Sequence, residues 1–582
     1  MPSEQPRRRL RHTFDSLRVR LARAEALPQL ATLGVICGLL TGIVIIAFRM
    51  LIEVSQSLFL PGANPENYEG LTMAWRFLLP LAGGLVLGLV FQFLPAESRN
   101  VGVVHVMERL SYHQGRLPLR NAIVQFLGGA VSIIAGHSVG REGPAIHLGA
   151  ASGSVAGRHL GLPNNSLRVL AGCGVAAAIA AAFNTPLAGV VFAMEVVIME
   201  YTVAGFAPVI LAAVSATALS QIVYGSAPAF TLPNIALGSL FELPFILVLG
   251  MAIGALAAAF TVITGFFAAR TKSVPVWVRL TAAGALTGLL ALLVPEIMSI
   301  GYDTVNAALL GQLTLVALGG IVVFKLLATA AGVGLGLPGG LIGPVLVLGA
   351  TAGSILGIAG QTLVPGHAST PGLYALLGMG AMMAGALQAP LAALTAVLEL
   401  TGNPNIIMPG MLAVIAATLT ARVVFNQPSV YIVLLRGRGL DYRNDPVTQS
   451  LRRLGVGGSM DGNVTVVPRK IDPERAQAEL ALNPDWILVR DGEKLVALQP
   501  AVDLARALKE QPEAKELDLL AIPAQRSQVA EVPLQATLQE ALEVLNATGT
   551  EAVYVSDGAP PGSEHVYGVL TREKIERSYR YS

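Results

Sequence analysis

Charged residues are scarce in this chain of 582 residues: 13% are Asp, Glu, Lys or Arg, whereas 53% are hydrophobic. Soluble domains usually carry about 25% charged residues, so the composition argues against a soluble globular enzyme. The scarcity is also local. Residues 28–435 hold twenty-six charges, while residues 1–27 hold ten and residues 436–582 hold forty. The middle of the chain is therefore expected to lie in lipid.

Long stretches of the middle region lack charge entirely. A membrane-crossing helix needs about 20 apolar residues, and each stretch is long enough for at least one crossing. A buried helix of a soluble protein would not recur in this way. The charge-free stretches are Leu30–Phe48, Phe77–Ala96, Tyr201–Phe241, Leu243–Ala269 and Leu326–Leu398.

Cysteines and catalytic motifs are also few or missing. Cys37 and Cys173 are the two cysteines, far apart in apolar segments, so we expect packing roles rather than a disulfide or a metal site. The sequence has no phosphate-binding Gly-Lys-Ser/Thr loop, no His-Glu-x-x-His zinc motif and no Gly-x-Ser-x-Gly turn. The spacing of His105, His137 and His147 does not fit metal binding, and these side chains are expected to pack or to form hydrogen bonds. We therefore expect no enzyme, no metal and no ATP-driven step.

Arginine clusters flank the apolar region. The first 27 residues carry seven Arg against three acids, without the apolar core of a cleavable signal. By the positive-inside rule the N-terminus is expected in the cytoplasm, and a second cluster puts the C-terminal part on the same side. The protein itself is expected in the cell (inner) membrane. Placement at membrane boundaries favours topology over nucleic-acid binding. The second cluster is Arg436, Arg438, Arg443, Arg452 and Arg453.

An internal repeat accompanies an abundance of helix breakers, 62 Gly and 35 Pro. GREGPAIHLGA at 140–150 matches GLIGPVLVLGA at 340–350, and GVAAAIAAAFNTPLAGVVFAMEV at 174–196 matches GMGAMMAGALQAPLAALTAVLEL at 378–400. Duplicated halves with Gly-Pro breaks at matching places indicate a transporter whose site lies between the repeats. The sequence predicts an all-α polytopic membrane domain of short, tilted, broken helices, with repeats at about 28–235 and 236–436.

The two Gly-rich segments suggest an anion site. Helix N-termini carry unpaired N–H groups and partial positive charge, so two such ends converging at the midplane would hold a small anion through residues such as Gly140 and Gly143. The first copy adds Arg141 and Glu142 where the second has Leu341 and Ile342. An ionisable residue at this depth is functional by default. Glu142 is expected to occupy the site as a tethered anion and to act as a gate.

These motifs resemble the CLC family of chloride channels and chloride/proton exchangers over about residues 28–436. GREGPAIH at 140–147 is similar to the family's GKEGPxxH, PGGLIGP at 338–344 to its GxFxP segment, and SVY at 429–431 to its Ser-Ile-Tyr. The resemblance implies that Glu142 is the gating glutamate, that Leu341 and Ile342 present amides to the anion, and that Tyr431 coordinates it by its hydroxyl. It also implies a homodimer in the lipid bilayer with one pore per subunit.

Two positions depart from the family pattern. Val101 stands where GSGIP supplies a coordinating serine, next to Gly102 in NVGVVHV at 100–106, so only backbone donors remain expected there. Val196 follows Glu195 where coupled exchangers have an inner glutamate. We therefore expect weak or absent proton coupling; the alternative is a proton-coupled anion antiporter that uses another route, through Glu195 or Glu200.

Residues 460–582 form a different region, joined by an exposed linker expected at 437–459. Two similar strand–helix–strand patterns predict a small cytoplasmic α/β pair, which resembles the CBS domains that many CLC proteins carry. Asp503 and Thr571 each keep half of the family's nucleotide pattern, so adenine nucleotide binding is doubtful and a packing module is the simpler expectation. A membrane-anchored nucleotide sensor is the competing hypothesis from another functional class.

Overall fold

The structure, a computed structural model, describes Leu21 and residues 27–199, 203–228, 230, 237–363, 369–440, 446–511 and 514–580. Some residues with expected roles lie outside these ranges. They are Glu200, Arg443 and the basic segment 1–27 apart from Leu21 and Leu27. The chain divides into two compact units. One comprises Ala31–Ala156 and Arg168–Tyr442, and the other is built around Arg443–Ser582.

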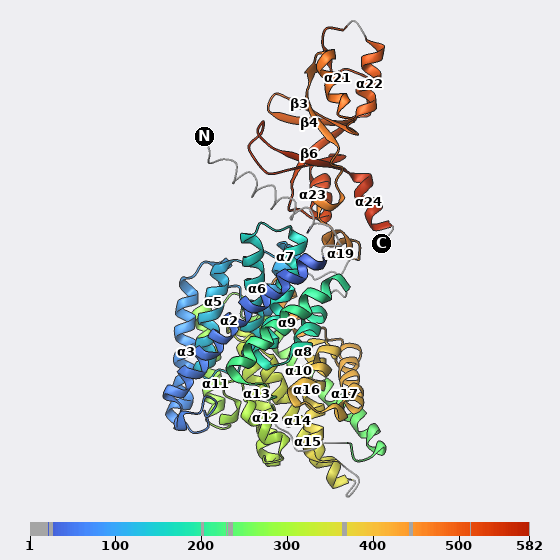
Figure 1. Cartoon of the computed structure of the whole chain (residues 1–582). Helices are drawn as coiled ribbons and strands as arrows, with labels where there is room; N and C mark the ends of the chain where they lie inside the picture. The colour runs from blue at the N-terminus through green and yellow to red at the C-terminus, as the bar shows by residue number, and fades with distance from the viewer. Residues whose placement is uncertain are drawn as a thin grey trace. The chain divides into compact units, whose positions relative to one another are not determined.

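The larger unit is a bundle of helices that differ greatly in length (Figure 1). Among the described residues, eight helices are long and apolar enough to cross a membrane, as the charge-free stretches predicted. Others are short or broken: α8 spans seven residues and continues into a π-helical turn, η3 (Ala193–Ile198). The first half comprises α2 (Leu27–Phe59), α3 (Met73–Phe93), α4 (Gly102–Tyr112), α5 (Leu119–Ile134), α6 (Glu142–His159), α7 (Asn164–Phe183), α8 (Pro186–Phe192) and α9 (Val203–Tyr224).

The second half repeats this order. It comprises α10 (Leu243–Arg270), α11 (Val276–Ala291), α12 (Tyr302–Leu309), α13 (Leu315–Leu335), α14 (Ile342–Leu363), α15 (Pro371–Leu387), α16 (Pro390–Thr401) and α17 (Ile407–Leu419), followed by α18 (Val430–Gly437). Thus α6 and α14 start 200 residues apart, as do α4 and α12. The repeat seen in two sequence blocks extends across the helical unit.

Glycines let corresponding helix pairs touch backbone to backbone. A Cβ on Gly149 of α6 would lie 2.1 Å from the carbonyl oxygen of Gly174 in α7, and one on Gly349 of α14 would lie 2.3 Å from that of Gly378 in α15. No larger side chain fits at such a crossing. The same contact therefore holds α6 against α7 in one repeat and α14 against α15 in the other.

The tail folds as two successive β-α-β-β-α patterns, as the sequence predicted. Parallel pairs β1–β3 and β6–β7 flank a helix each, antiparallel hairpins add β4 and β8, and β4 pairs with β6 to give one sheet in the order β1-β3-β4-β6-β7-β8. The first pattern comprises β1 (Val464–Pro468), α21 (Pro473–Ala481), β3 (Trp486–Asp491), β4 (Lys494–Pro500) and α22 (Ala501–Glu510). The second comprises β6 (Ser527–Pro533), α23 (Leu538–Thr548), β7 (Ala552–Ser556), β8 (Val566–Thr571) and α24 (Arg572–Arg580).

The segment expected as an exposed linker is partly helical instead. Its described part contains α19 (Pro446–Arg453) and α20 (Val456–Ser459). Leu451 and Val456 are buried in the apolar core that α23 and β7 also form. The Arg and Gly content suggested a solvated connection, but these apolar side chains and two backbone hydrogen bonds, from Val456 N–H to Ala536 O and from Leu538 N–H to Leu454 O, hold the segment against the tail.

Candidate anion site

The two Gly-rich segments meet through their backbones. Gly140 N–H donates to Gly340 O at 2.7 Å, and Gly340 N–H donates to Gly140 O at 2.6 Å. Immediately after this bridge the chain enters α6 at Glu142 and α14 at Ile342. The expectation that both segments open helices and converge is therefore confirmed in the geometry of these residues.

The Glu142 carboxylate lies between the two helix starts and is fully buried. Its Oε2 is so close to Gly140 that a Cβ there would approach it to 1.8 Å, and its Oε1 would lie 2.9 Å from a Cβ on Gly343. The backbone amides of Glu142 and Gly343 face the carboxylate. Oε2 has no hydrogen-bond partner among the described residues.

Tyr302, the first residue of α12, contacts the gate candidate from the second repeat. Its hydroxyl donates to Glu142 Oε1 at 3.2 Å. Its ring packs edge-on against Phe230 and Phe183, and the Arg141 guanidinium lies 5.5 Å from the ring centre. Sequence reasoning missed Tyr302, because nothing in the sequence places residue 302 beside residue 142.

A hollow of about 370 Å³ approaches the bridge from the side on which α18 ends, and we call it the Tyr431 vestibule. Tyr431 is 3% exposed, and its hydroxyl has no partner among the described residues. The vestibule brings together five of the predicted anion-site residues, namely Val101, Gly102, Gly143, Leu341 and Tyr431. Gly140 and Ile342 lie at the bridge and at the start of α14.

Four cations also line the Tyr431 vestibule, none of them assigned an anion-site role from the sequence. They are Arg99, Lys272, Arg279 and Arg438. Arg438 pairs with Glu108 at 3.2 Å, and Arg99 donates to the carbonyls of Leu94 and Gln92. Cations around a concave mouth raise the local anion concentration.

A second hollow, of about 290 Å³, reaches the bridge region beside Arg141 and Tyr302. Arg141 lies here rather than in the Tyr431 vestibule. Its guanidinium is 3.6 Å from Glu53, which also binds Arg49 at 2.5 Å. We call this hollow the Arg141 vestibule. The Tyr431 vestibule is lined by Gly143, and the Arg141 vestibule by Arg141 and by Tyr302, which bonds to Glu142.

The valine that replaces the family serine begins α4 as its N-cap, and its side chain forms no capping bond. A different side chain reaches this helix end instead. Gln125 Oε1 accepts from Gly102 N–H at 2.6 Å. One of the backbone donors expected to remain on this side is thus already bonded within the protein.

Glu195 and its repeat counterpart Glu399 form reciprocal helix caps. Glu195 accepts from the N–H groups of Leu391 and Ala392 at the start of α16. Glu399 accepts from those of Leu187 and Ala188 at the start of α8. Val196 is buried. Glu195, expected as one proton route, therefore bonds to a helix N-terminus.

His105 of α4 and His147 of α6 form a buried pair. His105 Nδ1 and His147 Nε2 are 2.8 Å apart, and the ring centroids are 5.1 Å apart with 29° between the planes. Because the nitrogens are close while the ring centroids are far apart, the two imidazole rings meet edge to edge. Among the described residues, no group of three or more His, Cys, Asp and Glu could hold a metal ion.

In the tail, both nucleotide candidates bond within the protein. Asp503 Oδ2 accepts from Gln525 N–H at 3.0 Å, and Thr571 Oγ accepts from Lys574 N–H at 3.4 Å. Lys574 in turn pairs with Asp461. Cys37 and Cys173 are buried and unpaired, and Cys37 donates to the carbonyl of Leu170.

Comparisons with known proteins agree on the helical unit. The sequence profile described as "Voltage gated chloride channel" matches residues 83–422, more than half of the chain. A ClcB-like chloride channel protein of Ralstonia nicotianae is 34% identical over 436 residues, covering 72% of this chain and 100% of that protein. The H(+)/Cl(-) exchange transporter ClcA of Salmonella arizonae is 28% identical, covering 72% of this chain and 90% of that protein.

Solved structures share the fold. A slow cyanobacterial Cl⁻/H⁺ antiporter superposes with a TM-score of 0.63 at 23% identity, covering 72% of this chain and 99% of its own. A eukaryotic CLC transporter superposes with a TM-score of 0.59 at 19% identity, covering 94% of this chain and 98% of its own. The protein is an integral membrane protein with a helical polytopic fold, and it is not an enzyme. The chain belongs to the voltage-gated chloride channel family, CLC, whose members move small anions.

Proposed function

We propose that the protein carries chloride or a similar small anion across the membrane, gated by Glu142, with weak or absent proton coupling. The observation that supports this most directly is the position of the Glu142 carboxylate between the starts of α6 and α14, beside the Gly140–Gly340 bridge. A carboxylate held there occupies the place that a mobile anion would take.

Binding uses neutral donors. The N-terminal N–H groups of α14 at Leu341 and Ile342, the α6 end at Gly143, and the Tyr431 hydroxyl offer partial positive charge without a full cation. Such a site holds an anion weakly enough to release it. The four cations of the Tyr431 vestibule raise the anion concentration at that mouth, whereas Arg49 and Arg141 on the other side share their hollow with Glu53 and Glu66.

Gating follows from competition between two anions. When Glu142 is ionised, its carboxylate is attracted to the same helix ends as the permeant anion. When Glu142 is protonated, that attraction falls and the side chain can leave. Flux should therefore depend on pH through this single acid.

Proton coupling is expected to be weak because Val196 stands where coupled exchangers of the family have an inner glutamate, and because the Glu195 carboxylate caps α16. The alternative, a proton-coupled antiporter with an unusual inner route, is favoured by the names of the relatives, which include an H(+)/Cl(-) exchange transporter and a Cl⁻/H⁺ antiporter. Glu200 would be its other acid.

We further propose a homodimer in the inner membrane with one pore per subunit and with both termini in the cytoplasm. The tail is proposed as a CBS-like pair. It serves packing rather than nucleotide binding, since Asp503 and Thr571 already bond internally. The rival hypothesis, a membrane-anchored nucleotide sensor, would leave the paired helix starts without a purpose.

The test is anion efflux from proteoliposomes with a panel of fluoride, chloride, nitrate and bicarbonate, with pH recorded in parallel. We expect flux of at least one of these anions, and we expect an imposed chloride gradient to drive little uphill proton movement with voltage clamped by valinomycin. Absence of flux for every anion would refute anion transport. Robust proton pumping would refute weak coupling alone and would favour the antiporter.

A further inference from the structure

Gln125 is a fully buried amide in the middle of α5, a helix that contributes no residue to the predicted anion site. Its side chain joins the two repeats. Oε1 accepts from Gly102 N–H at 2.6 Å, and Nε2 donates to the carbonyl oxygen of Pro338 at 3.1 Å. Gly102 begins α4, whereas Pro338 lies in the loop that leads into α14.

Both partners of Gln125 line the Tyr431 vestibule. Gly102 belongs to the wall formed by the start of α4, and Pro338 to the wall formed by 336–341. One amide therefore connects two walls of the vestibule, and its length fixes their separation. Val101 offers no hydroxyl to the start of α4. The Gln125 amide instead supplies a side-chain hydrogen bond to this helix end, at Gly102.

The rest of the same α5 face contacts the same segments. One turn earlier, Asn121 Nδ2 donates to the carbonyls of Glu97 and Asn100 at 2.7 and 2.9 Å. About one turn later, a Cβ on Gly128 would lie 3.2 Å from the Pro338 ring, and one on Gly129 would lie 2.9 Å from the Pro144 ring. Residues spaced three to four apart share one helix face. The α5 face thus supports the loop before α4, the loop before α14 and the first turn of α6.

We propose that Gln125 is a positioning residue that sets the width of the anion pathway at the Tyr431 vestibule, and that it thereby determines selectivity among anions of different size. The inference rests on the proposed function. A purely apolar side chain of this length would leave the buried Pro338 carbonyl and the part-buried Gly102 N–H without their partner, which is costly. Glutamine satisfies a donor and an acceptor at once, and it adds no charge beside the anion.

The test replaces Gln125 by methionine, which keeps the length and removes both hydrogen bonds. Anion efflux from proteoliposomes is measured for fluoride, chloride, bromide and nitrate. We expect flux to persist and the ratio between the fastest and the slowest anion to fall by more than about fivefold, because each of the two lost hydrogen bonds, at about 1 kcal/mol, corresponds to a factor of about five. Gln125→Asn, shorter by one methylene, should narrow the ratio less because its amide can still bond one wall.

Gln56→Met is the matched control. Gln56 is also buried and donates to the Tyr68 hydroxyl at 2.9 Å, so its loss removes a buried amide outside the Tyr431 vestibule. Its selectivity ratios should stay unchanged. Unchanged ratios in Gln125→Met would overturn the inference, and so would loss of all flux in both Gln125 variants, which would mark Gln125 as a purely structural residue. Absence of flux in the unsubstituted protein would instead refute the proposed function.

Discussion

Glu142 differs from its repeat counterpart Ile342 in charge but not in backbone position, since each lies at the first turn of its helix. A buried carboxylate needs donors, and among the described residues the Tyr302 hydroxyl donates to it while the amides of Glu142 and Gly343 face it. Because these donors would also suit a mobile anion, the proposed gate requires no larger movement of the fold.

Replacing Glu142 by glutamine removes the titrating group while keeping its volume. We expect anion flux that no longer varies with pH, because a neutral amide competes equally weakly for the helix ends at every pH. Chloride efflux from proteoliposomes between about pH 4 and pH 8 measures this. Glu53→Gln, in the Arg141 vestibule, is the control and should keep the pH dependence; an unaltered pH profile in Glu142→Gln would rule out the gate.

At the scale of elements, the reciprocal caps join the start of α8 to Glu399 near the end of α16, and the start of α16 to Glu195 in the π-helical turn that follows α8. Each glutamate satisfies two N–H groups of a helix in the other repeat. Interactions at helix starts of this kind contribute about 0.5–2 kcal/mol. The caps therefore favour a structural role for Glu195 over a role in proton transfer.

Glu195→Gln separates the two roles. An amide still offers an oxygen to α16 but loses the charge, so we expect a cost of about 1 kcal/mol in stability and no change in the ratio of protons to anions moved. Thermal unfolding in detergent and paired flux recordings measure these quantities. Glu399→Gln breaks the symmetric cap and should behave identically; a proton ratio that drops only in Glu195→Gln would assign it to the proton route.

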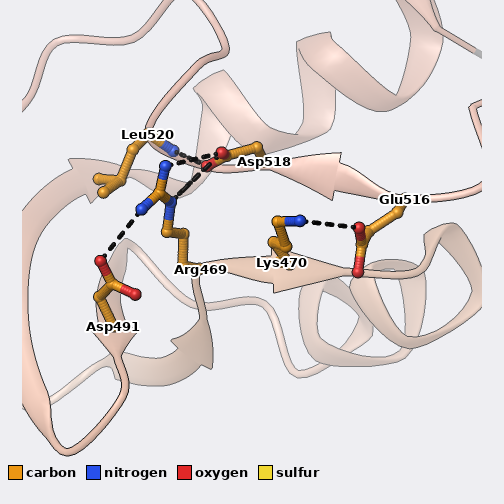
Figure 2. A network of polar contacts seen from close by, with 6 residues as sticks. All are labelled: Arg469, Lys470, Asp491, Glu516, Asp518 and Leu520. Atoms are coloured by element: carbon orange, nitrogen blue, oxygen red, sulfur yellow. Dashed lines mark hydrogen bonds and ion pairs between the residues drawn. The ribbon is translucent and has the colours of Figure 1, made fainter.

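A network of ion pairs and hydrogen bonds links the two short strands β2 (Lys470–Ile471) and β5 (Leu517–Asp518) of the tail (Figure 2). Arg469 binds Asp518 at 3.1 Å and Asp491 at 3.2 Å, and Leu520 N–H donates to Asp518. The Arg469 guanidinium, with the Leu520 amide, holds the pKa of the Asp518 carboxyl below its usual value. The ionised form is therefore favoured in the folded tail.

The pH dependence follows from that direction. A lowered carboxyl pKa stabilises the fold above the ordinary Asp pKa of 3.8, and the contribution is lost as pH falls through the lowered value. Asp518→Asn should thus make the tail unfold at lower urea concentration at pH 7, with the difference shrinking in acid. Fluorescence of the full-length protein, including Trp486 of β3, follows unfolding. Glu516→Gln removes only an exposed pair with Lys470, so it should have little effect; an equal loss in both variants would contradict the assignment.

For the whole molecule, the sequence predicted architecture better than contacts. Charge-free stretches predicted the apolar helices, the repeat predicted that 140–144 and 340–344 meet, and alternating patterns predicted the tail strands. The contacts of Gln125, Tyr302 and the His105–His147 pair could not be predicted, because each joins residues on separate helices and depends on how those helices cross. The buried Leu451 and Val456 were missed because two apolar residues among Arg and Gly give little periodic signal.

The tail gives the whole-molecule prediction. We expect calorimetry of the full-length protein with millimolar ATP to show no binding heat, because Asp503 and Thr571 bond to Gln525 and Lys574. Titration of inorganic phosphate serves as the control for binding of a simple anion at the basic vestibule. Heat with ATP that is absent with phosphate, and that disappears in Asp503→Ala, would overturn the packing interpretation.

The bridge between Gly140 and Gly340 is made only of main-chain atoms. The neighbouring side chains could therefore change after the duplication without loss of the contact between the two copies. One copy carries an arginine and an acid where the other carries leucine and isoleucine, so a symmetric backbone can support a pathway with two unlike ends.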